Sequence, residues 1–593
     1  MINRLTVYVL LASSICLQPR TLFAQEMDKM WGDKAVTTKK SQADSDKGKR
    51  FREGKYAMFI HWGLFSQFAN KWNGKTYYGI GEWMMDKNMA NLTTAEYAPI
   101  AKEFNPVDFN AKAIVQLAKN AGMKYIIVTA KHHDGFAMYD SKASDFNIVK
   151  ATPFKRDPMK ELAKACAEAG MGFGFYYSHN QDWTTPYGTV FNTKDNLDPK
   201  SFESYFRHKC LPQVEEITSN YGPIELVWFD TPGDMKKEYI EELVAVVRKN
   251  QPNAFVSGRA GHGLGDYNTL GDMEIPLSNV DGLWEAVDVS NDAWGYAWYD
   301  NNWKDPKEIL RRLISTVARG GTYMLNIGPD GRGNVPHQQQ KTLLAVGEWL
   351  KRYPDAIYQA EASPWKHALP WGDITKKKNK LSLSVYNWPN TGKLYIPGLQ
   401  TAIKTSRLLT GKNTIPLKHY TEQGWTVLDI PFAPGDPLVS IIELELSGEA
   451  RVDPSLALDP QGVSTFAAEF AETSAVKKFR KGWMEKFGEW KHVTQVTEWT
   501  DQGTATWTIN VLKPGYYQTE LEYSGEGRLV WRIDQKGGQA VQNQQNSSNI
   551  YTWQPMGWMY FAKPGTYEIA VSLVEGKQKS TSLSGLRFSP IRF

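Results

Sequence analysis

Apolar and polar positions follow two different rhythms along the chain, and the first covers about the first 350 residues. Residues 110–121 carry apolar side chains at helical spacing and end at Gly122, and the short apolar run 125–130 comes next. The same order returns at 158–169, which a glycine again closes, and at 172–177. Helical spacing that ends at a glycine and precedes a short apolar run predicts a helix followed by a buried strand.

Further helix–strand pairs extend this pattern. They are expected at 201–221 with 225–229, at 236–250 with 255–258, and at 305–318 with 323–327, and a last helix is expected at 338–353. Repeated units of this kind predict a parallel sheet, and about 300 residues suit an α/β fold of the (β/α)8 barrel type with insertions. We assign residues 25–360 to this barrel. The segment 263–300 has no clear helical pattern, so we expect an irregular barrel there.

The second rhythm begins after residue 360, where apolar and polar residues alternate with a period of two. Residues 381–386 follow it, as does the end of the run 441–446, and turn residues separate the short segments. Such alternation is typical of strands with one buried face. We therefore predict a β-sandwich at 361–448, a proline-containing linker at 449–462 and a further all-β module at 463–593.

The N-terminal residues 1–24 have the pattern of a signal peptide. Arg4 precedes the apolar stretch 5–17, and Ala24 is a plausible cleavage point. The apolar stretch is too short to span a bilayer, and no later run approaches that length. The sequence therefore predicts a protein exported to the periplasm or secreted.

Charge and cysteine content exclude several classes of protein. Removal of residues 1–24 takes away two arginines and no acids, which leaves 67 − 64 = +3. This near-neutral balance gives no argument for a nucleic-acid or membrane partner. Only Cys166 and Cys210 then remain, so no disulfide framework or zinc-binding spacing exists. Cys166 lies in a helical run and is expected to pack as a small apolar residue.

Polar side chains follow the apolar run 56–60, a further expected strand, and four of the strands above, at the point where each ends. They are His61, Lys131 to Asp134, Ser178 with His179, Asp230 and Arg259. The carboxyl ends of the parallel strands in a barrel meet at one rim, where barrel enzymes build their active sites. The sequence therefore predicts an enzyme with its site at this rim.

Asp230 is the leading candidate for a catalytic carboxylate. It ends the run Leu226-Val-Trp-Phe-Asp230, a short apolar strand that delivers one carboxylate to its tip. The alternative role is an N-cap for the helix at 236–250, but Asp234 is better placed for it.

The adjacent histidines His132 and His133 raise the question of a metal site. Neighbouring residues at a strand end point in opposite directions, and no His-x-x-x-His or carboxylate triad accompanies them. Hydrogen bonding to sugar hydroxyls is the better interpretation, and we expect neither a metal nor another cofactor.

Glycoside hydrolysis needs a second carboxylate. The candidates lie in two segments, one with Asp272 and Glu274 and one with Glu285 and Asp288. An aromatic neighbour desolvates a carboxyl group and raises its pKa, which suits a general acid. Glu285 follows Trp284 and is therefore the first choice.

Together these stretches resemble the α-L-fucosidases of glycoside hydrolase family 29. The resemblance covers about 50–360 in the family's order. It rests on Phe59-Ile-His-Trp-Gly63, Glu82-Trp83, Lys131-His-His-Asp-Gly-Phe136, Tyr176-Tyr-Ser178, Leu226-Val-Trp-Phe-Asp230, Trp284-Glu285, Trp294-Gly-Tyr296 and Leu325-Asn-Ile-Gly-Pro329.

The resemblance implies a retaining hydrolase of fucosylated oligosaccharides or glycoconjugates, with Asp230 as nucleophile. The family's acid/base position varies in sequence and falls here most naturally on Glu285. The residues after Glu285 depart from the family pattern, which keeps Asp288 and Glu274 open as alternatives. The implied fucose pocket consists of His61, Glu82, Trp83, His132, His133, Tyr177, Arg259 and Trp294.

Three other interpretations remain open. The chain is a retaining glycosidase for another sugar, a carbohydrate-binding protein on a degenerate enzyme scaffold, or a metalloenzyme that uses its two adjacent histidines. The intact Asp230 argues against the second. The sequence indicates neither the linkage cleaved nor the oligomeric state.

The module at 463–593 is rich in tryptophan. It contains Trp483, Trp490, Trp499, Trp507, Trp531, Trp553 and Trp558. Most are expected to fill a core, while Trp553 and Trp558 flank a loop-like stretch and are candidates for stacking on sugar rings. The barrel supplies every expected catalytic group, so we expect deletion of 463–593 to leave the rate on small aryl fucosides nearly unchanged and to weaken activity only on polymeric or surface-bound glycans.

Overall fold

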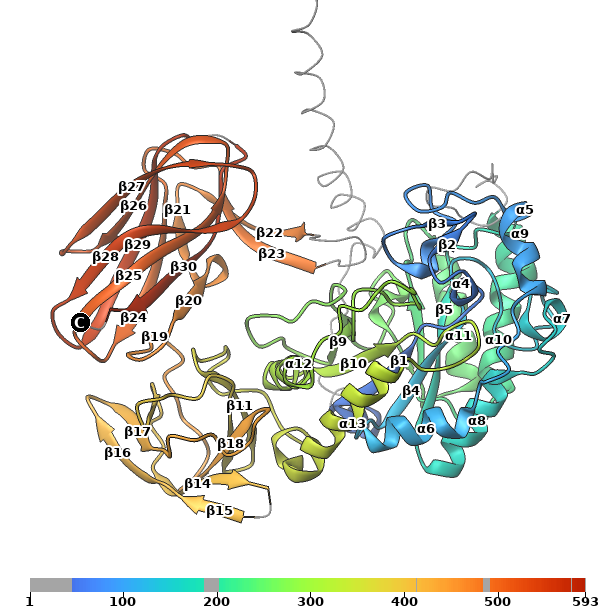
Figure 1. Cartoon of the computed structure of the whole chain (residues 1–593), viewed down its shortest axis with the longest axis horizontal. Coiled ribbons are helices and arrows are strands. Elements are labelled where there is room, and N and C mark those ends of the chain that lie inside the picture. The colour runs from blue at the N-terminus through green and yellow to red at the C-terminus, as the bar shows by residue number, and fades with distance from the viewer. Residues whose placement is uncertain (1–44, 186–201, 412, 484–490, 578, 592–593) are drawn as a thin grey trace, which may run out of the picture.

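Eight parallel strands form the sheet at the centre of the first part of the chain in the computed structural model (Figure 1). The structure describes residues 45–185, 202–411, 413–483, 491–577 and 579–591, so the expected signal peptide and Trp490 lie outside it. The strands lie in the order β7-β6-β5-β4-β1-β10-β9-β8. Their bounds are β1 Tyr56–Ile60, β4 Tyr125–Lys131, β5 Gly172–Ser178, β6 Leu226–Asp230, β7 Phe255–Val256, β8 Asn268–Thr269, β9 Trp284–Val289 and β10 Thr322–Ile327.

The sheet curls so that its two end strands approach each other. The Asp266 amide, just before β8, donates to the Val256 carbonyl in β7 at 2.8 Å, and the Val256 amide donates to the Asp266 carboxylate at 2.8 Å. Arg248 holds the other oxygen of that carboxylate at 2.7 Å. The predicted barrel-like fold is confirmed. The expected irregularity is present too, because only the 3₁₀ turn η5 (Gly258–Ala260) and the two-residue strand β8 lie between β7 and β9.

Helices cover the outside of the barrel. The larger ones are α6 (Ala111–Asn120), α8 (Pro158–Ala169), α10 (Leu211–Ser219), α11 (Lys237–Asn250), α12 (Pro306–Ala318) and α13 (His337–Arg352), and α3 (Asp46–Gly54) precedes β1. Their starts follow from local chemistry: Asp305 accepts from the Glu308 amide at 2.7 Å while Pro306 occupies the first turn. No described helix is long and apolar enough to cross a membrane.

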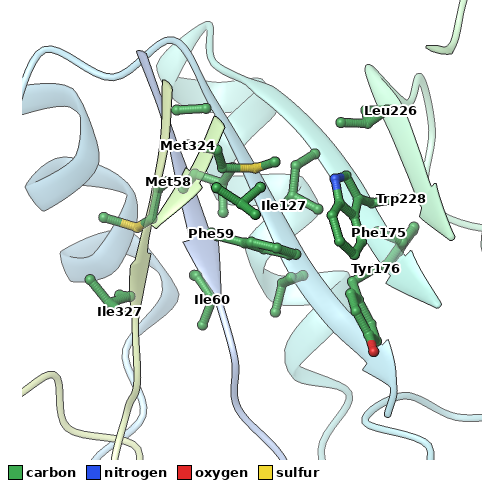
Figure 2. Close-up of a cluster of buried hydrophobic side chains, with 14 of the residues drawn as sticks. Met58, Phe59, Ile60, Ile127, Phe175, Tyr176, Leu226, Trp228, Met324 and Ile327 are labelled. Carbon is green, nitrogen blue, oxygen red and sulfur yellow. The ribbon is translucent and has the colours of Figure 1, made fainter. Parts of the chain in front are cut away.

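Side chains from five neighbouring strands fill the barrel interior. Figure 2 shows Phe59 of β1, Ile127 of β4 and Met324 of β10 among them, all fully or almost fully buried, whereas Met58 and Ile60 of β1 lie on the opposite face of the sheet. Phe59, Tyr176 and Trp228 form an aromatic group. The Phe59 and Trp228 ring centroids lie 5.1 Å apart edge to face, and the Tyr176 and Trp228 rings are stacked with centroids 5.5 Å apart. This group supports the rim at which the predicted site residues lie.

A β-sandwich of two antiparallel sheets follows the barrel. One sheet has the order β11-β12-β18-β14-β15 and the other β13-β17-β16. The strands are β11 Gly372–Lys377, β12 Lys380–Val385, β13 Lys393–Ile396, β14 Ile403–Thr410, β15 Asn413–Pro416, β16 Lys418–Glu422, β17 Trp425–Asp429 and β18 Ser440–Leu446. Alternate residues such as Leu381, Leu383, Ile442 and Leu444 build its core.

The C-terminal module consists of two further sheets. Strands β19, β24, β29, β26 and β27 form one with β21, and β22, β23, β30, β25 and β28 form the other with β20. Their bounds are β19 Leu456–Leu458, β20 Ser464–Ala467, β21 Glu472–Ser474, β22 Lys477–Trp483, β23 Lys491–Thr497, β24 Thr504–Val511, β25 Gly515–Ser524, β26 Gly527–Gln535, β27 Ala540–Ser547, β28 Thr552–Phe561, β29 Gly565–Glu575 and β30 Ser582–Pro590. β19 lies within the range expected to be a linker and pairs parallel to β24.

The tryptophans of this module lie in its core and on its surface, but the loop expected between Trp553 and Trp558 is wrong, because both residues belong to strand β28. Trp499, Trp507 and Trp531 are buried in the core. Trp553 is half-buried and lies under the Arg587 guanidinium, 4.2 Å from its ring centroid. Trp558 is 50% exposed.

A buried ion pair joins the barrel to the sandwich. Arg319, which follows α12, contacts Asp373 of β11 at 2.8 Å, and both side chains are at most 3% exposed. Ser315 and Tyr386 donate to the other carboxylate oxygen at 2.6 and 3.0 Å. Both oxygens of the Asp373 carboxylate are thus bound by protein groups, which come from both domains.

We predict that Asp373→Ala destabilises the protein by about 3 kcal/mol, because removal of one partner leaves the Arg319 charge buried and unpaired. Chemical denaturation followed by tryptophan fluorescence measures the change. Asp355→Ala is the matched control, since Asp355 at the end of the barrel pairs with Lys377 of β11 at the surface and is 60% exposed. Equal effects of the two substitutions would contradict the assignment of the buried pair as an interdomain anchor.

Candidate active site

A pocket opens at the carboxyl ends of the barrel strands. It encloses about 370 Å³ of empty space, including the space at its mouth. Its wall is contributed by residues from six of the eight strand ends and the loops that follow them. The lining residues are Phe59, His61, Glu82, Trp83, His132, His133, Trp228, Asp230, Thr231, Arg259, Asp272 and Trp294.

Asp230 ends β6 with its carboxylate held on both oxygens. The Tyr176 hydroxyl donates to Oδ2 at 2.9 Å, and Arg259 Nη1 donates to Oδ1 at 3.2 Å. His133 Nε2 lies 3.8 Å from Oδ2. The next residue, Thr231, has a left-handed backbone with φ of 48°, which turns the chain away immediately after the carboxylate. The carboxylate is therefore fixed in orientation while one edge faces the pocket.

The three histidines of the pocket are neutral. Burial lowers the pKa of His61 to about 4 and also lowers the pKa of His132 and His133. His61 Nδ1 lies 2.8 Å from Asn326 Oδ1, and His133 Nδ1 lies 2.7 Å from the Ser178 hydroxyl. A neutral imidazole offers one donor and one acceptor, so these rings suit hydroxyl groups better than anions.

Two more carboxyl groups line the pocket. Burial raises the pKa of Glu82 to about 7, although the Gly295 amide donates to its Oε2 at 2.9 Å. Burial likewise raises the pKa of Asp272 to about 6 against the opposing effect of Arg259. Both groups therefore hold a proton more readily than an exposed carboxyl group does.

Arg259 connects the two aspartates. Its Nη1 contacts Asp230, while its Nη2 contacts Asp272 and donates to the Leu270 carbonyl at 2.9 Å. The guanidinium carbon also lies 5.1 Å from the Trp228 ring centroid. The two carboxylates therefore lie within reach of the two ends of one guanidinium.

Aromatic rings provide the apolar part of the wall. Phe59 contacts the His61 ring at 4.6 Å and the Trp294 ring at 6.2 Å, both edge to face. Trp83 meets the His133 ring at 5.5 Å, almost perpendicular to it. The pocket thus alternates hydrogen-bonding imidazoles with flat apolar faces, a combination that suits a sugar ring.

Most of the sequence-predicted site residues come together in this pocket. They are Asp230, His61, Glu82, Trp83, His132, His133, Arg259 and Trp294. Tyr177 and Glu285 do not line it.

Tyr177 points to the opposite side of β5 and donates to Gln213 Oε1 of α10 at 2.9 Å. Its neighbour Tyr176 reaches Asp230 instead, because successive side chains of a strand point to opposite faces. The pairing of β5 with β6 explains the difference. Tyr176 lies opposite Trp228, and Trp228 is two residues before Asp230 and so faces the same side of the sheet.

Glu285 lies at the start of β9, behind Trp228 as seen from the pocket. Its Oε1 accepts hydrogen bonds from the Trp228 indole at 2.5 Å, the Tyr267 hydroxyl at 3.0 Å and the Thr269 hydroxyl at 2.9 Å. The side chain is fully buried. The structure therefore does not bring Glu285 to the pocket with Asp230.

The two alternatives to Glu285 are also engaged elsewhere. Asp288 forms ion pairs with Arg312 and Lys304. Glu274 pairs with Arg480 of the C-terminal module. Asp272 is the member of these two segments that lines the pocket, and it lies on a loop whose sequence gives no periodic signal.

A metal site is not formed by the histidines of the rim. Within the described ranges, no group of three or more histidine, cysteine, aspartate or glutamate side chains is arranged to hold a metal ion. Cys166 and Cys210 are both buried and unpaired with each other.

Comparisons with known proteins identify relatives of both the barrel and the whole chain. The alpha-L-fucosidase family model matches residues 23–355. The tissue alpha-L-fucosidase of Rattus norvegicus is 29% identical over 386 residues, which cover 60% of this chain and 80% of the rat protein. The plasma alpha-L-fucosidase of Homo sapiens is 28% identical over 375 residues, which cover 58% and 77%.

Two solved structures extend the similarity beyond the barrel. The alpha-L-fucosidase from Vibrio sp. strain EJY3 has a TM-score of 0.76 at 29% identity and covers 95% of this chain and 99% of its own. The alpha-L-fucosidase GH29 from Bacteroides thetaiotaomicron has a TM-score of 0.61 at 26% identity, covering 70% and 98%.

The buried Glu285 carboxyl group predicts a pH-dependent stability. Burial raises its pKa from the ordinary 4.5 to about 7. The folded state therefore keeps the proton at pH values where the unfolded chain loses it. The free energy of unfolding is highest below about pH 4.5 and falls as the pH rises to about 7. The difference corresponds to about 3 kcal/mol.

We expect Glu285→Gln to remove this loss, because the amide keeps an oxygen for the three donors and does not ionise. The stability of the variant relative to the original protein should increase by about 3 kcal/mol between pH 4.5 and 7.5, measured by urea denaturation. Glu238→Gln, at an exposed position of α11, is the control and should leave the pH profile unchanged. Parallel profiles for Glu285→Gln and the original protein would refute the prediction.

Proposed function

The chain belongs to the alpha-L-fucosidase family and is a glycoside hydrolase, and from this premise we propose an exo-acting enzyme that removes terminal α-L-fucosyl residues with retention of configuration. The observation that carries the proposal is the arrangement of two carboxyl groups around one buried guanidinium. Asp230 and Asp272 both contact Arg259 and both line the pocket. Retaining glycosidases place such a pair about 5–5.5 Å apart.

In the proposed mechanism Asp230 is the nucleophile. Its carboxylate forms a bond to the anomeric carbon while the glycosidic bond breaks, which gives a covalent fucosyl-aspartate. A water molecule then attacks the same carbon and releases fucose and free Asp230. Two displacements at one carbon restore the original configuration. The contacts from Tyr176 and Arg259 support this role, because they hold the attacking oxygen in place.

We assign the acid/base role to Asp272. Its raised pKa of about 6 keeps a share of the group protonated near neutral pH, so that it can donate to the leaving oxygen and later accept a proton from water. Arg259 stabilises the carboxylate that this donation leaves behind. Glu82 is instead held by the Gly295 amide, which suits a fixed acceptor for a sugar hydroxyl.

The rest of the pocket matches the chemistry of fucose. The sugar lacks a hydroxyl at its sixth carbon, so its methyl group needs an apolar wall, which Phe59 and Trp294 provide. Its remaining hydroxyls need neutral donors and acceptors, which the buried imidazoles of His61, His132 and His133 supply. The natural substrates proposed are fucosylated oligosaccharides or glycoconjugates, met after export directed by residues 1–24.

We expect Asp230→Gly to lower kcat on an aryl fucoside by at least ~10³-fold. Azide should restore part of the turnover, because the small anion can occupy the space of the missing carboxylate. NMR of the first-formed sugar should show α-fucose from the original enzyme. A β-fucose product at early times would overturn the nucleophile assignment.

Asp272→Ala tests the second role. Loss of a general acid costs about 10²–10⁴-fold on a substrate whose leaving group needs protonation, whereas a 4-nitrophenyl fucoside needs little and should retain most of its rate. Glu285→Gln is the matched control, since its carboxyl group is off the pocket. Selective loss on unactivated fucosides in Glu285→Gln but not in Asp272→Ala would return the acid role to Glu285.

We further propose that the C-terminal module binds glycans through a surface group of three aromatic residues, Tyr516, Trp558 and Tyr560. They are 37%, 50% and 43% exposed and lie on neighbouring strands β25 and β28. The Tyr516 ring lies 4.9 Å from Trp558 and 4.7 Å from Tyr560. Flat exposed rings beside polar groups such as Gln539 favour stacking with sugar rings.

Trp558→Ala combined with Tyr516→Ala should weaken retention on an immobilised fucosylated glycoprotein at least ~10-fold, since a stacked ring contributes about 1 kcal/mol or more. Turnover of the aryl fucoside should stay the same. Phe432→Ala removes a 77% exposed aromatic residue from the other sandwich and serves as the control. Unchanged retention in the double variant would remove the basis for this glycan site.

A further inference from the structure

A hairpin of the C-terminal module extends to the rim of the barrel. Strands β22 and β23 project from that module toward the barrel (Figure 1). Two of their residues, Arg480 and His492, meet Glu274 of the barrel. The His492 amide and its Nδ1 both lie 3.0 Å from Glu274 Oε2, and Arg480 pairs with Oε1.

Glu274 lies two residues beyond Asp272 on the segment 270–283, which we call the Asp272 loop. Its side chain is 5% exposed although it carries a carboxylate. The Gly271 amide donates to Glu274 Oε2 at 3.2 Å, so the same carboxylate also ties the loop to itself around Asp272. The barrel thus provides only part of the partners of the buried Glu274 carboxylate, and the C-terminal module provides others.

A second contact holds the far part of the loop. Ser278 donates to Glu469 of the C-terminal module at 2.8 Å. The barrel holds the loop through Arg312, which donates to the Met273 carbonyl at 2.8 Å, through Arg259, and through the Met273 amide, which donates to the Val287 carbonyl of β9 at 2.9 Å. Met273 itself has a left-handed backbone with φ of 61°. A loop without helix or long strand is therefore fixed from two domains, with Asp272 between the attachment points.

We propose that Arg480 and His492 are positioning residues for the acid/base step, and that the catalytic unit of this enzyme includes the C-terminal module. The proposal rests on the function proposed above for Asp272. Loss of the contacts from Arg480 and His492 to Glu274, which we call the Glu274 clamp, releases the loop. The Asp272 carboxyl group then moves away from the leaving oxygen, whereas Asp230 on β6 keeps its own contacts. This inference limits the expectation that the module matters only for polymeric or surface-bound glycans: a small aryl fucoside keeps its rate, whereas a small alkyl fucoside needs the module.

The mechanism predicts which substrates are affected. Displacement of a general acid slows the bond cleavage that needs a proton and leaves a well-activated leaving group almost unaffected. A general loss of fold or of sugar binding would instead slow all substrates alike. The ratio of kcat/KM values for two leaving groups therefore separates positioning from a merely structural role.

The test uses the full chain with Arg480→Ala and His492→Ala combined. We expect kcat/KM on an alkyl fucoside to fall by about 10-fold or more and kcat/KM on 4-nitrophenyl fucoside to change less than about threefold. Lys477→Ala is the control, because Lys477 pairs with Glu498 on the same hairpin away from the loop. His492→Asn should retain more of the alkyl fucoside rate than His492→Ala, since its amide can donate in place of Nδ1.

A second measurement does not depend on activity. Amide hydrogen exchange in residues 270–276 should accelerate at least ~10-fold in the double variant, while exchange in β6 stays unchanged. Glu274→Ala should give the same exchange pattern, and adding it to the double variant should have little further effect, because the three residues form one contact.

Unchanged exchange in the loop, or equal rate losses on both fucosides, would overturn the proposal. Failure of the original protein to hydrolyse any fucoside would instead contradict the proposed function, while the exchange experiment would still test the clamp.

Discussion

One buried guanidinium, that of Arg259, connects the parts on which the site depends. It is 4% exposed, so its charge has to be met by protein groups. Asp230 and Asp272 meet it, one at the tip of a central strand and the other on an irregular loop. One positive charge between two carboxyl groups favours ionisation of one more than of both. One carboxyl group therefore stays ionised and can act as the nucleophile, while the other can hold a proton and act as the donor.

The two aspartates differ in how firmly the fold holds them. Asp230 ends β6, which is hydrogen-bonded between β5 and β7 and buried along its whole length. Asp272 has no such neighbouring strands, because the chain between β7 and β9 contains only the 3₁₀ turn η5 and the two-residue strand β8. Its position comes from two backbone hydrogen bonds to β9, donated by the Leu270 and Met273 amides, and from side-chain contacts. These reach from the barrel through Arg312 and from the C-terminal module through Arg480 and His492.

Local chemistry explains why much of the fold was predictable. The helix expected at 158–169 has those bounds, because Asp157 caps it, Pro158 opens it and Gly170 ends it in a left-handed conformation. Six barrel strands, all except β8 and β9, follow from apolar runs. β9 was missed because Glu285 and Asp288 interrupt its apolar run. β8 was missed because two residues carry no period, and β19 was missed because a three-residue strand lies among prolines and polar residues. Most pocket residues follow from strand ends in the same way.

The second carboxylate was beyond this reasoning for a geometric reason. Trp284 and Glu285 are neighbours in sequence, but they point to opposite sides of β9: the Trp284 indole donates to the Arg319 carbonyl, whereas Glu285 reaches the Trp228 indole inside the barrel. The desolvation expected at Glu285 is real, yet it serves a buried hydrogen-bond network and not the pocket. Asp272 carries no comparable local signal, since its burial and its partner arise only when distant segments fold around it. A catalytic group that depends on another domain for its position leaves little trace in its own neighbourhood of the sequence, and this is why strand patterns identify the nucleophile more readily than its proton donor.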